Sequence, residues 1–215
     1  MFKDQRNVLG LALILVGIFF TLEQFGLIPD NARALLTTAL FVIASLVMFG
    51  LFLADRQRWW ACMVGFFLAG LAGSALLGLV SPQLAETLSG PIFLGSMGLG
   101  FASVFLLQRE MWWAIIPAGV MFSLTAVSYL EASNLALPFN PSGLLFIGLG
   151  LTFLLLTRVR SNGLGMQWGY YPAVPLLVLG VLLSLGSEAY WSILGPLLLI
   201  GAGAWLLLGA LRKRA

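Results

Sequence analysis

The chain has 215 residues, of which 60% are hydrophobic and 9% are charged, and its mean hydropathy is +1.03. Soluble domains carry roughly 25% charged residues, so this composition excludes an ordinary soluble globular protein. The sequence contains no histidine and a single cysteine, Cys62. The commonest general base and metal ligand is therefore missing, and one thiol forms neither an internal disulfide nor a zinc cluster. We expect no catalytic, cofactor-binding or metal-binding residue and no cofactor.

Hydropathy predicts eight transmembrane helices within a single transmembrane domain that takes up residues 1–215. A spanning helix needs about 20 apolar residues. The predicted helices lie at 8–27, 34–54, 59–80, 91–108, 111–130, 141–157, 172–186 and 192–211. The first run is too long for a signal-peptide core and is expected to be retained as a helix. The sixth and seventh runs are short for a hydrocarbon core of roughly 30 Å, so we leave open whether they span it fully.

The charged residues predict the orientation of these helices. If every run crosses, ten of the eleven basic residues fall on one side of the membrane, and only Arg33 lies on the other. The ten are Lys3, Arg6, Arg56, Arg58, Arg109, Arg158, Arg160, Arg212, Lys213 and Arg214. By the positive-inside rule this side is cytoplasmic, with both termini inside. Because the basic residues are spread over helix ends rather than gathered in one patch, no nucleic-acid partner is expected.

Aromatic residues gather at the same predicted boundary. They are Trp59, Trp60, Trp112, Trp113, Trp168, Tyr170 and Tyr171, each at the start of a predicted helix. Amphipathic rings favour the headgroup level of a bilayer, so we interpret these residues as a membrane-interface belt. The alternative is an aromatic cage for a cationic ligand, which requires the rings to converge on one cavity.

Internal repetition divides the chain into four hairpins of two helices. The pattern W-[AG]-x-x-P-A occurs at 113–118 and again at 168–173, and Trp59-Trp60-Ala61 precedes Trp112-Trp113-Ala114 by 53 residues. The predicted repeats are approximately 1–57, 58–110, 111–167 and 168–215. Since each unit crosses twice, all four copies have the same orientation, unlike the inverted repeats of many transporters.

Pairs of glycines recur in the second helix of the later hairpins and are predicted to pack helices together. They are Gly98 with Gly100, Gly148 with Gly150, and Gly201 with Gly203. Lipid tails are as apolar as leucine, so membrane helices associate where small residues let their backbones approach. The alternatives are a face for a partner protein's helix, or a phosphate-binding loop, for which the required lysine is missing.

The predicted helix interiors contain hydroxyl groups but no charged residue. A charge at the bilayer centre costs on the order of 2.5–3.5 kcal/mol and marks transport or catalytic sites. We expect the hydroxyls to bond back to carbonyls of their own helices. Glu23, Glu131 and Glu188 lie near the outer boundary, either as solvated helix ends or as an acidic ring that attracts cations.

The segments 7–18 (NVLGLALILVGI) and 195–201 (GPLLLIG), within short apolar helices joined by Leu-rich turns, resemble the bacterial LiaI/LiaF-like transmembrane region family. A weaker similarity is to HdeD-like membrane proteins, which also open hairpins with aromatic residues. The first resemblance implies a bacterial inner-membrane protein without catalysis, sometimes linked to envelope-stress signalling.

We therefore predict a non-catalytic, multi-pass protein of the bacterial cytoplasmic membrane. It would act through lateral helix contacts as an accessory, scaffold or envelope-stress component, with the lipid bilayer and another membrane protein or a second copy of itself as partners. The alternative is a small permease or channel for an apolar or weakly polar solute, which requires a continuous cavity leading inward from the outer glutamates.

Overall fold

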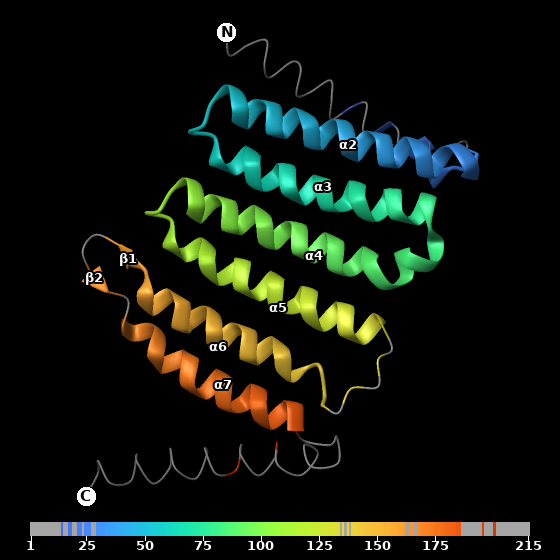
Figure 1. The fold of residues 1–215 in the computed structure, drawn as a ribbon. Helices are drawn as coiled ribbons and strands as arrows, with labels where there is room; N and C mark the ends of the chain where they lie inside the picture. The colour runs from blue at the N-terminus through green and yellow to red at the C-terminus, as the bar shows by residue number, and fades with distance from the viewer. Residues whose placement is uncertain are drawn as a thin grey trace, which may run out of the picture.

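In the part of the chain that it describes, the computed structural model is all-helical except for one short hairpin (Figure 1). It describes residues 14, 17–18, 21–22, 24–26, 29–133, 135, 137, 139–161, 164–165, 167–185, 195 and 200. The helices are α2 (Asp30–Ala54), α3 (Trp59–Val80), α4 (Pro82–Leu107), α5 (Ile115–Ala132), α6 (Gly143–Arg158) and α7 (Tyr170–Leu185). Two 3₁₀ turns, η1 (Trp112–Ala114) and η2 (Gln167–Gly169), precede α5 and α7. The strands β1 (Arg160–Ser161) and β2 (Leu164–Gly165) pair antiparallel between α6 and α7.

Within the described residues, five helical segments are long and apolar enough to cross a membrane. They are Ala32–Ala54, Trp59–Val80, Pro82–Leu107, Trp112–Ala132 and Gln167–Leu185. In a bilayer the backbone has no water to bond, so a spanning segment must satisfy its own polar groups, as a helix does. The helix Gly143–Arg158 is equally apolar in character but shorter, with 16 residues. The chain is thus a multi-pass membrane protein by the length and composition of its helices.

The predicted helix 59–80 coincides with α3, and the predicted boundaries of α2, α5, α6 and α7 fall within four residues of those observed. The predicted start at residue 91 is wrong, because α4 begins nine residues earlier, at Pro82. Pro82 suits the first helical turn, where no N–H donor is needed. Pro91 lies inside α4, which membrane helices tolerate when other groups bond the freed backbone. The predicted first and eighth helices lie outside the described residues, apart from single positions.

The helices α2 to α7 lie side by side in chain order, as a single row (Figure 1). Each of the helices α3 to α6 packs mainly on the helix before it and the helix after it in the sequence. Short connections of four, one and four residues join α2 to α3, α3 to α4, and α4 to η1, and such short loops place consecutive helices antiparallel. The row therefore leaves the two broad sides of its inner helices without a covering helix from the described part of the chain.

The contacts between helices are made largely by small residues. On α3 the buried residues are Ala61, Cys62, Gly65, Gly70 and Ala72, whereas large side chains such as Leu99 on α4 and Leu151 on α6 are half exposed. The packing forces in lipid are close van der Waals contacts and hydrogen bonds rather than the hydrophobic effect. This burial pattern, with small residues inward and large ones outward, is the arrangement expected of helices surrounded by acyl chains.

Candidate helix-contact and membrane-interface sites

The predicted packing glycines of α4 and α6 lie against neighbouring helices. A Cβ atom added at Gly98 would lie 2.9 Å from the Phe122 ring of α5, and one at Gly100 would lie 3.2 Å from the carbonyl oxygen of Met63 on α3. Each glycine of the pair thus faces a different neighbour, because residues two apart on a helix point in nearly opposite directions. A Cβ atom at either position would therefore require its neighbour to shift, the Phe122 ring at Gly98 and the α3 backbone at Gly100.

The second described pair has the opposite arrangement. Gly148 faces Ser123 on the preceding helix α5, whereas a Cβ at Gly150 would lie 2.6 Å from Cγ of Leu177 on the following helix α7. In α4 it is the first glycine that faces the following helix. The two Gly-x-Gly motifs are therefore not in equivalent environments. Gly201 and Gly203 lie outside the described residues.

A reciprocal contact between hydroxyls and glycines joins α5 to α6. Gly119 and Ser123 on α5 face Thr152 and Gly148 on α6, so that each hydroxyl lies against the glycine of the other helix. Each hydroxyl donates to a carbonyl of its own helix, Ser123 to Gly119 and Thr152 to Gly148, both at 2.7 Å. The hydroxyl oxygens consequently occupy the groove between the helices, while their protons are donated to carbonyl oxygens of their own helices. We call these four residues the α5–α6 clasp.

Other hydroxyls along the row also bond to backbone carbonyls. Thr37, Thr38, Ser96, Ser103 and Thr125 donate within their own helices at 2.7–2.9 Å. This is the arrangement expected from the sequence. Since each of these hydroxyls donates its proton to a backbone carbonyl, they do not form a chain of hydroxyl-to-hydroxyl hydrogen bonds.

Two hydroxyls bond across helices instead. Ser45 on α2 donates to the carbonyl oxygen of Gly65 on α3 at 3.0 Å, and Ser74 on α3 donates to that of Ser89 on α4 at 2.8 Å. The second bond lies two residues before Pro91, whose missing N–H interrupts the backbone bonding of α4. Both bonds fasten neighbouring helices together.

The charged side chains whose positions are described lie near helix ends or in turns. Glu131 is exposed at the end of α5, and Glu86 is exposed in the fifth position of α4. Glu23 and Glu188 lie outside the described residues, so the predicted acidic ring is represented by Glu131 alone. In the described part of the chain, no three His, Cys, Asp or Glu residues are grouped to hold a metal ion.

Cys62 is buried between α3 and α4, where its sulfur lies 3.4 Å from Oγ of Ser103. A cavity of about 110 Å³ lies between the same two helices. Its lining consists of Met63, Val64, Phe67, Met97 and Phe101, and is almost wholly apolar. With no polar group to orient a solute, this cavity is not a binding site for a hydrophilic molecule.

The predicted aromatic belt lies at one end of the row, at the left in Figure 1, where the turns from α2 to α3, from α4 to α5 and from α6 to α7 are found. The Trp112 and Trp168 rings meet edge to face at 6.2 Å, and the Trp168 and Phe153 rings meet similarly at 6.0 Å. These contacts join the beginnings of α5 and α7 across the end of α6. Tyr170 and Tyr171 lie beside them with exposed side chains, and Trp59 is half-buried at the start of α3.

Three tryptophans at this end share one local environment. Trp60, Trp113 and Trp168 are 45%, 42% and 43% exposed. The residue after each is small and buried, namely Ala61, Ala114 and Gly169, and a buried small residue follows four positions later, namely Gly65, Ala118 and Ala173. An outward tryptophan and an inward stripe of small residues are therefore found at the start of α3, in η1 leading into α5, and in η2 leading into α7.

Two turns at this end match in sequence and backbone. The sequence F-x-x-x-R-x-x-W-W-A runs from Phe52 to Ala61 and from Phe105 to Ala114. Both helices end at an extended residue, with φ and ψ of −144° and 101° at Asp55 and of −132° and 91° at Gln108. In the first turn the Arg58 N–H donates to the carbonyl oxygen of Asp55 at 3.0 Å. In the second turn the Met111 N–H donates to the carbonyl oxygen of Gln108 at 2.9 Å. We call the segments 52–61 and 105–114 the twin turns.

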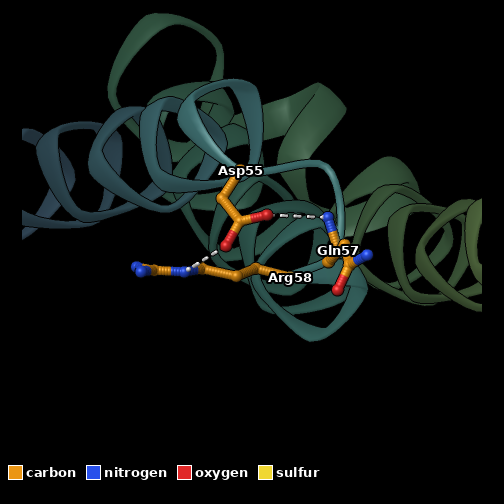
Figure 2. A network of polar contacts seen from close by, with 3 residues as sticks. All are labelled: Asp55, Gln57 and Arg58. Atoms are coloured by element: carbon orange, nitrogen blue, oxygen red, sulfur yellow. Dashed lines mark hydrogen bonds and ion pairs between the residues drawn. The ribbon is translucent and has the colours of Figure 1, made fainter.

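An arginine in each twin turn lies over a phenylalanine of its own helix. The guanidinium carbon of Arg56 is 4.8 Å from the centre of the Phe52 ring, and that of Arg109 is 4.6 Å from the centre of the Phe105 ring. A cation over a ring face is attracted by the ring quadrupole, and a positive charge also suits the C-terminal end of a helix. The first turn is further held by Asp55, which accepts from the Gln57 N–H at 3.0 Å and from Nε of Arg58 at 3.2 Å (Figure 2).

Phe52 and Phe105 are the interface residues that the sequence interpretation missed. The signal was present, because the spacing of 53 residues that relates the two Trp-Trp-Ala segments also relates these phenylalanines and the arginines that follow them.

Comparison of the chain with protein-family models, with curated proteins and with solved structures finds no match.

Proposed function

We propose that the chain is a non-catalytic membrane protein that acts through lateral contacts of its helices, as a scaffold or accessory component. The observation that supports this is the single row of helices, in which large apolar side chains point outward from most helices. A row of this kind offers extended sides to lipid and to the helices of a partner membrane protein or of a second copy. The described helices carry no ionisable group in the middle of a span.

The finer topology belongs to the same proposal. It comprises eight spans, four parallel hairpins, cytoplasmic termini and a place in a bacterial inner membrane, with a role connected to envelope stress. The twin turns and the shared environment of Trp60, Trp113 and Trp168 support the repetition. The two Gly-x-Gly motifs face their neighbouring helices in opposite order. The structural similarity between the repeats is therefore confined to the helix ends that carry the tryptophans.

Site-specific photo-crosslinking in native membranes tests the scaffold proposal. A photoreactive residue at Leu99 on α4 or Leu151 on α6, each about half exposed, is expected to capture a membrane protein or a second copy. The matched control is the same residue at Val104, which is fully buried and is expected to give only crosslinks within the chain. Capture of lipid alone at both exposed positions would contradict the proposal.

The permease alternative gains less support. The hydroxyls that would line a path donate to backbone carbonyls, and the cavity between α3 and α4 is apolar. Purified protein in liposomes separates the two functions. Saturable solute flux that is lost in Glu131→Gln would establish the permease, whereas the scaffold proposal expects no flux above that of empty liposomes.

A further inference from the structure

We propose that each twin turn binds the phosphate of one anionic phospholipid headgroup through the guanidinium of Arg56 or Arg109. The ligand class is a lipid with a net negative headgroup, such as phosphatidylglycerol. The proposal concerns a pair of lipid sites and is separate from the protein contacts proposed above.

The geometry leaves the donors of both arginines available. A guanidinium that lies over a phenylalanine ring uses its planar face for the ring, and its N–H groups point outward from its edges. Both arginines are exposed. Among the residues that the structure describes, neither arginine forms an ion pair. In the first turn the Asp55 carboxylate is engaged by Arg58 and Gln57. An arginine edge of this kind suits two parallel hydrogen bonds to a phosphate.

The ring fixes the position of each guanidinium before a ligand binds. Phe52 is buried and Phe105 is half-buried against the helices beside them, so each arginine side chain is held along its own helix rather than extended freely into water. Less side-chain entropy is lost on binding when the side chain is already ordered. The backbone angles at Asp55 and Arg58 lie within about 12° of those at Gln108 and Met111, so the two turns present their charges in similar local geometry.

The position of the turns favours lipid over a soluble anion. Each arginine lies two residues after the end of a membrane-length apolar helix, and the half-exposed indoles of Trp60 and Trp113 come four residues later. Indole rings prefer the headgroup level, which is also the depth of the lipid phosphates. Among the described residues at this end of the row, basic residues outnumber acidic ones: the basic residues are Arg56, Arg58, Arg109, Arg158 and Arg160, and the acidic residues are Asp55 and Glu110.

The test measures the binding of phosphatidylglycerol and phosphatidylcholine to the full-length protein in detergent, by native mass spectrometry and by the lipid-dependent shift in thermal unfolding. Wild type is expected to bind phosphatidylglycerol more tightly and to retain up to two such molecules. In the double variant Arg56→Gln with Arg109→Gln the affinity of each of the two sites is expected to fall about fivefold, the effect of losing one basic residue near the lipid surface.

The matched control is Arg33→Gln, which removes one positive charge at the opposite end of the row. It is expected to change the affinity less than twofold. Equal binding of the two lipids by wild type would overturn the proposal. An equal loss in the control and in the single variant Arg56→Gln would also overturn it, since net charge alone would then explain the preference. Unchanged unfolding temperatures in lipid-free detergent establish that the variants are folded.

Discussion

The side chain of Thr152 on α6 lies directly against Gly119 on α5, while its hydroxyl donates to the carbonyl oxygen of Gly148 at 2.7 Å. The hydroxyl is therefore satisfied by its own helix and at the same time fills the groove that the glycine leaves open. Ser123 and Gly148 repeat this relationship in the opposite direction. Close approach of two backbones is the main source of association for helices in lipid, so the α5–α6 clasp is expected to fix the distance between these two helices.

Substitution of Gly119 by alanine is expected to destabilise the protein by about 1–3 kcal/mol, the usual cost of overpacking. The added Cβ would overlap Oγ1 and Cγ2 of Thr152 and lie 2.7 Å from its Cβ. Adding Thr152→Ala removes two of these three atoms, so the double variant is expected to recover part of the loss. The free energy of unfolding of the two single variants and the double variant in detergent gives the coupling energy.

The matched control for this cycle is Gly78→Ala on α3, since an added Cβ there meets nothing within 4 Å. Alanine also favours a helix over glycine by about 0.8–1 kcal/mol, so this variant is expected to be neutral or slightly more stable. Additive effects of Gly119→Ala and Thr152→Ala would show that the two residues are not in the contact described.

The contact between α6 and α7 predicts a larger effect at Gly180. A Cβ there would lie 2.6 Å from the backbone nitrogen of Ile147 and 2.9 Å from the carbonyl oxygen of Gly143. Backbone atoms cannot move aside as a side chain does, so Gly180→Ala must push the two helices apart. We expect a greater loss of unfolding free energy than for Gly119→Ala, measured in the same assay. A smaller loss would contradict this account of the close approach.

Hydropathy and charge were sufficient to predict most individual helices but not their arrangement. The boundary at Trp59 is clear because the charged segment 55–58 separates two apolar runs. The predicted start at residue 91 was wrong because an apolar helix in lipid accommodates Pro91 in its interior. The single row depends on which small residues meet which neighbours, as Gly100 meets Met63 and Gly150 meets Leu177. Hydropathy contains no information about these lateral contacts.

Asp55 is expected to stabilise the first twin turn mainly through its backbone contact. Its carboxylate accepts from the Gln57 N–H, and the ion pair with Arg58 joins side chains that are 46% and 39% exposed. Exposed ion pairs contribute about 0–1 kcal/mol. Asp55→Asn keeps an oxygen for the Gln57 N–H, so we expect a loss below about 0.5 kcal/mol, whereas Asp55→Ala loses both contacts, at about 1 kcal/mol for the hydrogen bond. Unfolding in detergent ranks the two variants, and a greater loss in Asp55→Asn would refute this ranking.

The proposed orientation predicts which loops a membrane-impermeant maleimide reaches in intact spheroplasts. In a Cys62→Ser background, a single cysteine replaces either Gln57, which is exposed in the turn between α2 and α3, or Leu135, which is exposed after α5. These positions lie at opposite ends of the row, because α3, α4 and α5 together cross it three times. In the proposed orientation Gln57 lies on the cytoplasmic side, because the arginines on that side follow the positive-inside rule. Leu135→Cys is therefore expected to react in intact spheroplasts, and Gln57→Cys only after the membrane is permeabilised. The reverse pattern would invert the topology, and labelling of both positions in intact spheroplasts would contradict an odd number of crossings between them.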